Sequence, residues 1–79
     1  MDELVQAMKK SLADTFAFYL KAQGFHWNVE GPNFPQYHAL FDTIYNEVYG
    51  SIDRFAEEIR AMDAYAPASF ARFSELTSL

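Results

Sequence analysis

Two long segments with apolar side chains at every third or fourth position constrain the fold of this chain more than any other feature. In the first segment the repeat begins at Leu4 and continues through Leu12 and Tyr19. This spacing places the apolar side chains on one face of an α-helix. We therefore predict an amphipathic helix over residues 3–27.

The second segment carries the same kind of repeat over a greater length. From Tyr37 to Met62, apolar residues follow one another at steps of 4-3-4-4-3-4-3, which predicts a helix over residues 34–63. Asn33 and Gln36 occupy the positions of a capping box at its start. Because this span is longer than most helices of globular proteins, we expect it to pack along its whole length.

A short connection separates the two predicted helices. Residues 28–33 contain Gly31 and Pro32, which are residue types that interrupt helices and form turns. A turn of this length joins two helices into an antiparallel hairpin. Further along, Ser69 stands where it can cap a short third helix over residues 70–76. The expected architecture is a single all-α domain over residues 1–79, made of a helical hairpin and a short third helix.

The composition excludes several kinds of small protein and points to assembly. The chain has 79 residues, of which 51% are apolar and none is cysteine, so a disulfide scaffold and a thiolate metal site are excluded. A hairpin buries one face of each helix, yet Leu40 and Tyr49 lie off the main apolar row. The remaining apolar side chains need a second chain to cover them, which predicts a homodimer at least, or a higher oligomer.

The charge balance argues against two classes of partner. Six basic and eleven acidic residues give a net charge of −5, whereas binding to the phosphate backbone depends on clustered cations. No run approaches the roughly 18 consecutive apolar residues that span a membrane, and the acidic start is unlike a signal peptide. We therefore expect no direct DNA binding, no membrane insertion and a cytoplasmic location.

Two pairs of potential metal ligands lie on the second predicted helix. His38 and Asp42 are separated by four residues, as are Asp53 and Glu57, so each pair shares a helix face and can hold one ion. At 100° per residue, all four side chains fall within an arc of roughly 100°. They form a polar stripe beside the apolar one.

Distance along the helix then predicts how a complete site would form. The centres of the two pairs are fifteen residues apart, about 22 Å along the helix axis, whereas metal–ligand bonds are about 2 Å long. A second copy laid antiparallel by two-fold symmetry brings the first pair of one chain to the second pair of the other, twice per dimer. His26 joins the first pair because the hairpin turn places it opposite His38. Two imidazoles and three carboxylates favour Fe(II), with Mn(II) or Zn(II) as substitutes.

Each of these residues taken alone has a simpler interpretation. A single acidic residue on a helix typically faces solvent. We interpret Glu47 and Glu58 in this way, because both lie outside the arc that holds the four potential ligands of the second helix. A single histidine such as His26 is more often structural than a ligand, and Trp27 is typical of a core or an interface. Only the joint spacing of the five residues favours a metal site.

The residues that carry these predictions also resemble a known family. The segment FHWNVEGPNF at 25–34 strongly resembles the HWNVxGPNF motif of the Dps (DNA-protection-during-starvation) mini-ferritins. The similarity continues through HALFD at 38–42 and IDRFAEEIRA at 52–61. It covers essentially the whole chain, but only the N-terminal half of a typical family member. The resemblance implies half of a ferritin-like four-helix bundle, completed by oligomerisation.

The resemblance also implies a function. It implies an iron-oxidising site shared across a two-fold dimer interface, with His26, His38 and Asp42 from one chain and Asp53 and Glu57 from the partner subunit. Trp27 matches the family tryptophan beside the iron site and is a candidate redox neighbour. The expected activity is that of a ferroxidase-type oxidoreductase, which oxidises Fe(II) with hydrogen peroxide or dioxygen, contributes to iron storage and protects against oxidative stress. The alternative is a non-catalytic structural or interaction protein that uses the hairpin as an assembly module within a larger complex.

Overall fold

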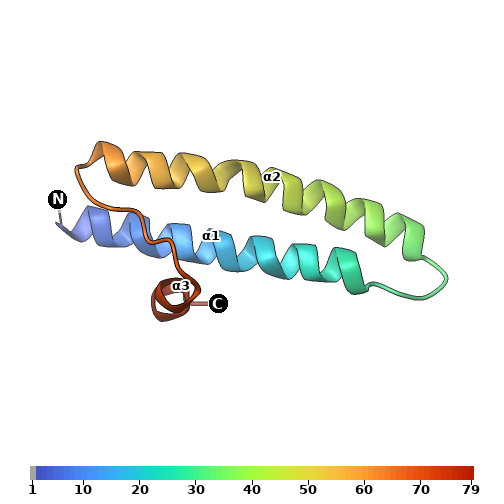
Figure 1. Ribbon diagram of the computed structural model, residues 1–79. Coiled ribbons are helices and arrows are strands. Elements are labelled where there is room, and N and C mark those ends of the chain that lie inside the picture. The colour runs from blue at the N-terminus through green and yellow to red at the C-terminus, as the bar shows by residue number, and fades with distance from the viewer. Residues whose placement is uncertain (1) are drawn as a thin grey trace.

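The computed structural model describes residues 2–79, so the first residue of the predicted domain lies outside it. Its elements are α1 (Asp2–Asn28), α2 (Phe34–Ala61) and α3 (Phe70–Leu76). α1 and α2 run antiparallel and side by side (Figure 1), giving a rod of 50 × 21 × 17 Å. No strand occurs among the described residues. The predicted all-α class, a hairpin with a short third helix, is confirmed.

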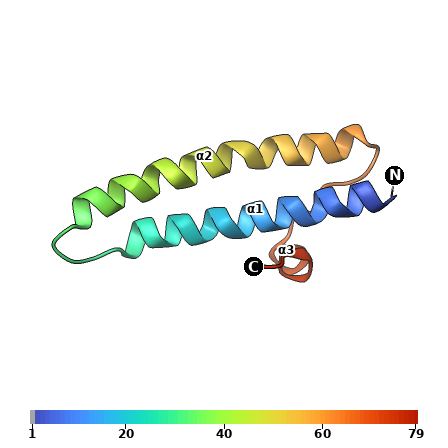
Figure 2. The same cartoon turned by 180° about the vertical axis from the view of Figure 1, so that it is seen from behind.

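The short helix α3 packs against α1 on the side away from α2. Both views of the chain agree on this arrangement (Figures 1 and 2), and α3 contacts α1 but not α2. The segment that follows α2 turns back across α1 to reach α3. Within residues 2–79, no helix is both long and apolar enough to cross a membrane.

The tightly buried core of the single chain is small. Leu12 and Ile59 are its two largest fully buried side chains, and one lies on each long helix. Large apolar side chains remain exposed elsewhere, among them Leu20 on α1 and Tyr49 on α2. This distribution agrees with the sequence-based reasoning that a hairpin buries only one face of each helix.

The turn between α1 and α2 depends on Gly31. Its φ of +107° lies in the region that glycine adopts without steric strain, and its carbonyl accepts a hydrogen bond from the Phe34 N–H at 3.1 Å. The predicted capping box is wrong, because the side chain of Asn33 makes no capping hydrogen bond. The backbone of Asn33, with φ −100° and ψ 21°, departs from the extended conformation that a capping side chain requires.

α2 ends at Ala61, two residues before the predicted boundary at 63. Asp63 adopts φ +60°, and its N–H donates to the Arg60 carbonyl at 3.0 Å while the Ala64 N–H donates to the Ile59 carbonyl at 3.3 Å. This pair of bonds is a Schellman motif, which closes a helix with one left-handed residue. The apolar repeat continues to Met62, so periodicity alone placed the end too late.

Two sets of contacts hold α3 to α1. The first is between aromatic rings: Phe16 of α1 and Phe73 of α3 stack with centroids 4.7 Å apart. α3 itself is capped by the Ser69 side chain, which accepts a hydrogen bond from the Arg72 N–H at 3.1 Å. After α3, the Thr77 hydroxyl donates to Asp14 Oδ1 at 2.7 Å. The Ser78 N–H donates to the same oxygen at 2.7 Å and the Ser78 hydroxyl to Oδ2 at 3.0 Å.

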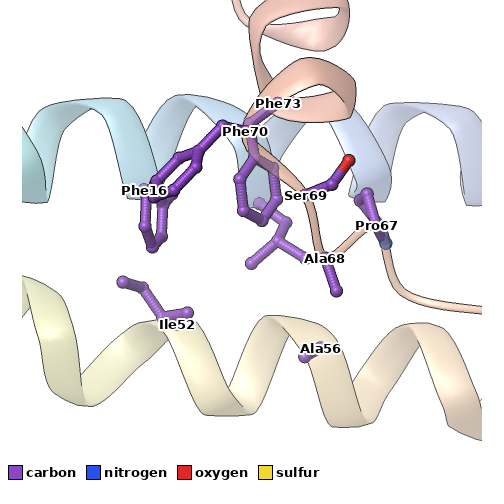
Figure 3. Close-up of a pocket in the computed structure, with 9 residues that line it drawn as sticks. Phe16, Ile52, Ala56, Pro67, Ala68, Ser69, Phe70 and Phe73 are labelled. Carbon is purple, nitrogen blue, oxygen red and sulfur yellow. The ribbon is translucent and has the colours of Figure 1, made fainter.

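An apolar groove of about 360 Å³ opens between the hairpin and the segment that leads into α3. Figure 3 shows Ile52 and Ala56 on its α2 side, facing Phe16, Phe70 and the residues before α3. None of the five predicted metal ligands lines this groove. The groove is therefore separate from the predicted metal site.

Candidate metal centre

The structure brings the two histidines together at the closed end of the hairpin, next to the turn. His26 lies in the last turn of α1 and His38 in the second turn of α2. Their rings stack with centroids 3.6 Å apart and planes inclined at 22°. His26 Nδ1 lies 2.7 Å from the His38 carbonyl oxygen, and His38 Nδ1 lies 2.8 Å from the His26 carbonyl oxygen. We call this reciprocal pair the histidine clamp.

The histidine clamp fixes the protonation pattern of both rings. A backbone carbonyl oxygen only accepts hydrogen bonds, so each Nδ1 must carry the proton and donate. In the neutral ring the other nitrogen, Nε2, then holds the free lone pair. A carbonyl that orients a histidine through one nitrogen and leaves the other available is a common arrangement behind metal ligands.

The clamp also satisfies a backbone group that the helix end leaves open. His26 is within the last four residues of α1, where carbonyl groups lack a partner in the helix. The His38 imidazole supplies that partner. The same hydrogen bonds that orient the two rings therefore join the end of α1 to the start of α2.

Asp42 lies one helical turn beyond His38, as the spacing predicts. Hydrogen bonding with the Asp42 carboxylate, with a smaller contribution from burial, raises the pKa of Tyr45. The Tyr45 ring also packs against His26, with centroids 5.1 Å apart. His26, His38 and Asp42 therefore belong to the same end of the hairpin, linked in part through Tyr45.

Asp53 and Glu57 lie further along α2 and are exposed. Neither forms an ion pair with the described part of the chain, where the recorded pair joins Arg72 and Glu75. Both carboxylates are therefore accessible to a second chain. No three acidic or histidine side chains of residues 2–79 cluster closely enough to hold one ion within a single chain.

Trp27 is 62% exposed. Within the described residues it pairs with no other aromatic ring, whereas its neighbour His26 contacts both His38 and Tyr45. Tyr45 is a residue near this site that the sequence analysis did not single out. Its position three residues after Asp42, which is one helical turn, was the available signal.

Comparison with known proteins establishes the family of this chain. The family model for the ferritin-like domain matches residues 5–79. The chain belongs to the ferritin-like family. The predicted similarity to Dps proteins is confirmed by the relatives and solved structures described next.

Among curated proteins, the chain is similar to the DNA protection during starvation protein of Brevibacillus brevis, at 35% identity over 91% of this chain and 48% of that protein. It is similar to the DNA protection during starvation protein 2 of Bacillus anthracis, at 31% identity over 98% of this chain and 53% of that protein. The chain spans about half the length of the curated relatives it matches.

Solved structures give the same result for the fold. A Dps protein from Vibrio cholerae O1, described as a member of a superfamily of ferritin-like diiron-carboxylate proteins, aligns with a TM-score of 0.94 and 32% identity. The alignment covers 98% of this chain and 48% of that one. A Dps protein from Bacillus brevis aligns with a TM-score of 0.87 and 35% identity over 96% and 52% of the two chains. The fold is therefore half of a Dps-type four-helix bundle.

Proposed function

We propose that this chain binds Fe(II) and oxidises it with hydrogen peroxide or dioxygen, at a site shared between two copies. One copy supplies His26, His38 and Asp42, and the second supplies Asp53 and Glu57. The observation that carries the proposal is the histidine clamp, because it leaves Nε2 of both imidazoles free to bind a metal. Two imidazoles combined with carboxylates suit Fe(II) as a substrate.

The residues of the chain have distinct roles in this proposal. The imidazoles hold Fe(II), and the carboxylates favour the more highly charged Fe(III) that oxidation produces. Hydrogen peroxide accepts two electrons, one from each of two Fe(II) ions. Its O–O bond breaks, and two protons complete two molecules of water. This stoichiometry consumes iron and peroxide together without releasing hydroxyl radical.

The exposure of the acidic pair supports a site shared between chains. Asp53 and Glu57 are accessible and form no ion pair with residues 2–79. A two-fold dimer would bring them from the other copy to the histidine end, as the fourth and fifth ligands beside His26, His38 and Asp42. Oligomerisation also covers apolar side chains that one chain leaves exposed, such as Leu20 and Tyr49.

The net charge of −5 bears on how such a protein would protect DNA. A chain with this charge has little electrostatic attraction to the phosphate backbone. We propose protection by removal of Fe(II) and peroxide, with iron retained as the oxidised ion, rather than by coating of DNA. The relatives named for DNA protection support the general role.

Replacement of Asp53 by alanine tests the proposal. Asp53→Ala removes one carboxylate from every shared site, so the rate of Fe(II) oxidation should fall to the rate in buffer. Glu58→Ala is the matched control, because Glu58 is also acidic, exposed and on α2 but lies outside the predicted ligand set. Helical content, measured by circular dichroism, should be the same in both variants. Equal oxidation rates in wild type and Asp53→Ala would contradict the proposal.

A second candidate function is a non-catalytic assembly module. The observation that favours it is the apolar groove beside α3, with Phe70 78% exposed next to it. In that case the metal ligands would only stabilise a dimer. A well-folded oligomer that takes up neither Fe(II) nor Zn(II) in a titration would favour this function over the first.

A further inference from the structure

Three adjoining grooves follow one flank of the hairpin along most of its length. The first has a volume of about 230 Å³ and is lined by apolar side chains that include Phe25 and Ile44. It shares Phe18 with a second groove of about 380 Å³. The second groove shares Ser51 with a third, of about 260 Å³, which Phe55 lines. We call this continuous surface the apolar strip.

The apolar strip faces nearly opposite to the predicted metal ligands. On α2, Ile44 follows Asp42 by two residues, and Phe55 follows Asp53 by two residues. A step of two residues turns an α-helix by about 200°. None of the five predicted ligands lines any of the three grooves. A dimer that shares the metal site therefore leaves the apolar strip uncovered.

The apolar strip is exposed and long. Phe18 is 48% exposed and Phe25 is 59% exposed in the single chain. From Met8 in the third groove to Phe25 in the first, the strip follows α1 for about 25 Å. Contiguous apolar surface of this kind marks a contact with another molecule. Its length suits a pair of helices better than a small ligand.

The charges that line the apolar strip cancel one another. Lys21 and Arg54 are basic, and Asp14 and Glu58 are acidic. The whole chain carries a net charge of −5, so the excess of acidic groups lies elsewhere. Because like charges placed opposite each other disfavour a contact, a neutral face is the one best suited to meet an identical face.

We propose that a second copy of this chain binds the apolar strip through its own apolar strip. The chain covers 48% of the aligned Vibrio cholerae O1 structure, and its fold is half of a four-helix bundle. Two hairpins placed face to face supply four long helices, and two-fold symmetry makes such a contact self-complementary. This contact is separate from the shared metal site, and the two contacts together join more than two chains.

Replacement of Phe18 by aspartate tests the proposal. Phe18 is half-exposed, so Phe18→Asp should keep the fold of the single chain but bury an unpaired carboxylate of each copy in the contact. Leu20→Asp is the matched control, because Leu20 is 47% exposed and lies two residues further on α1, about 200° around the helix. Leu40→Asp provides a second variant on α2, since Leu40 is 50% exposed and one turn before Ile44. Circular dichroism should show equal helical content in all variants.

Sedimentation equilibrium of the 79-residue chain in metal-free buffer measures the contact. Without a metal, the carboxylates of the ligand face repel those of a second copy, so association through the apolar strip should dominate. Wild type and Leu20→Asp should form dimers with similar dissociation constants. Phe18→Asp and Leu40→Asp should raise the dissociation constant at least about tenfold, because burial of an unpaired charge is costly.

The same measurement can overturn the proposal. A metal-free wild type that stays monomeric would show that the apolar strip does not bind a second copy. Equal weakening of the dimer by Phe18→Asp and Leu20→Asp would show that the contact is not specific to the apolar strip. A Phe18→Asp dimer as stable as that of wild type would place the contact on another face. The proposal does not depend on Fe(II) oxidation, since the predicted ligands lie outside the apolar strip.

Discussion

His26 and His38 each donate their Nδ1–H to the other's backbone carbonyl, at 2.7 and 2.8 Å, while their rings stack at 3.6 Å. This reciprocal arrangement serves two purposes with one set of contacts. It joins the ends of α1 and α2 next to the turn, and it leaves both Nε2 atoms free. Stability at this end of the hairpin and metal binding are therefore properties of the same two side chains.

Loss of one histidine should destabilise the metal-free protein. His38→Ala removes the hydrogen bond from His38 Nδ1 to the His26 carbonyl, worth about 1 kcal/mol, together with the ring stacking. The backbone carbonyl of residue 38, which His26 Nδ1 binds, is kept. The free energy of unfolding should therefore fall by about 1–3 kcal/mol. Urea denaturation at a fixed protein concentration measures the change, with Gln36→Ala, an exposed α2 neighbour, as the control. An unchanged midpoint would mean that the clamp contributes nothing to stability.

Mixing two inactive variants should restore activity if the site is shared between chains. His38→Ala and Asp53→Ala are each defective at every site of their own dimers. A mixed dimer has one site in which both residues are intact, since each chain contributes its unaltered half. After unfolding and refolding of a one-to-one mixture, random pairing should restore about a quarter of wild-type sites. Fe(II) oxidation measures the recovery, and a mixture no more active than its components would exclude a shared site.

The contacts of Asp14 should make the attachment of α3 sensitive to acid. Hydrogen bonds from the Thr77 hydroxyl and the Ser78 N–H lower the pKa of Asp14 below its ordinary value of 3.8. The ionised form is therefore the one that folding stabilises. The stabilisation is complete above about pH 4 and is lost as the pH falls through the lowered pKa.

Hydrogen exchange of residues 70–79 checks this prediction. At neutral pH, Asp14→Asn should exchange faster there than wild type, because an amide presents one acceptor oxygen where the carboxylate presents two. The difference between the two proteins should shrink in acid, where wild-type Asp14 becomes protonated. Glu75→Gln is the control, since its ion pair with Arg72 at 2.9 Å is exposed and local. Equal exchange of wild type and Asp14→Asn at pH 7 would contradict the prediction.

Two glycine substitutions should have effects of opposite sign. Gly31 adopts φ +107°, so Gly31→Ala should destabilise the protein by about 1–3 kcal/mol through backbone strain. Gly24 is helical with open space around its missing Cβ, so Gly24→Ala should stabilise it by up to about 1 kcal/mol. Thermal denaturation of the two variants at one concentration compares them directly. A stabilising Gly31→Ala would show that the turn tolerates another backbone conformation.

Much of the fold could be predicted from local patterns. The repeat of apolar residues located both long helices, because burying one face of a helix requires apolar side chains every three or four residues. The Gly31–Pro32 segment located the turn, and Ser69 marked the start of α3. The errors lie at helix ends. Asn33 has a capping residue type but the wrong backbone angles, and Asp63 ends α2 although no glycine marks the position.

The candidate site was only partly predictable for a related reason. Spacing on one helix relates His38 to Asp42, and Asp53 to Glu57, because residues four apart share a face. It also placed His26 opposite His38 through the turn. It did not predict that each histidine would bind the other's carbonyl, nor that Tyr45 would contact both His26 and Asp42. Those contacts depend on how far α2 is rotated and shifted against α1.

The amino-acid sequence by itself therefore determined the helices, the turn and the chemical types of the five predicted ligands, since each depends on residues close together in the chain. Tertiary structure decided the orientation of the imidazoles and the position of Tyr45. It also decided the attachment of α3 to α1, in which the Thr77 hydroxyl donates a hydrogen bond to Asp14, 63 residues earlier in the chain. The physical reason is that hydrogen bonds require distances accurate to a few tenths of an ångström. Only the packing of whole helices sets distances of that accuracy between residues remote in the sequence.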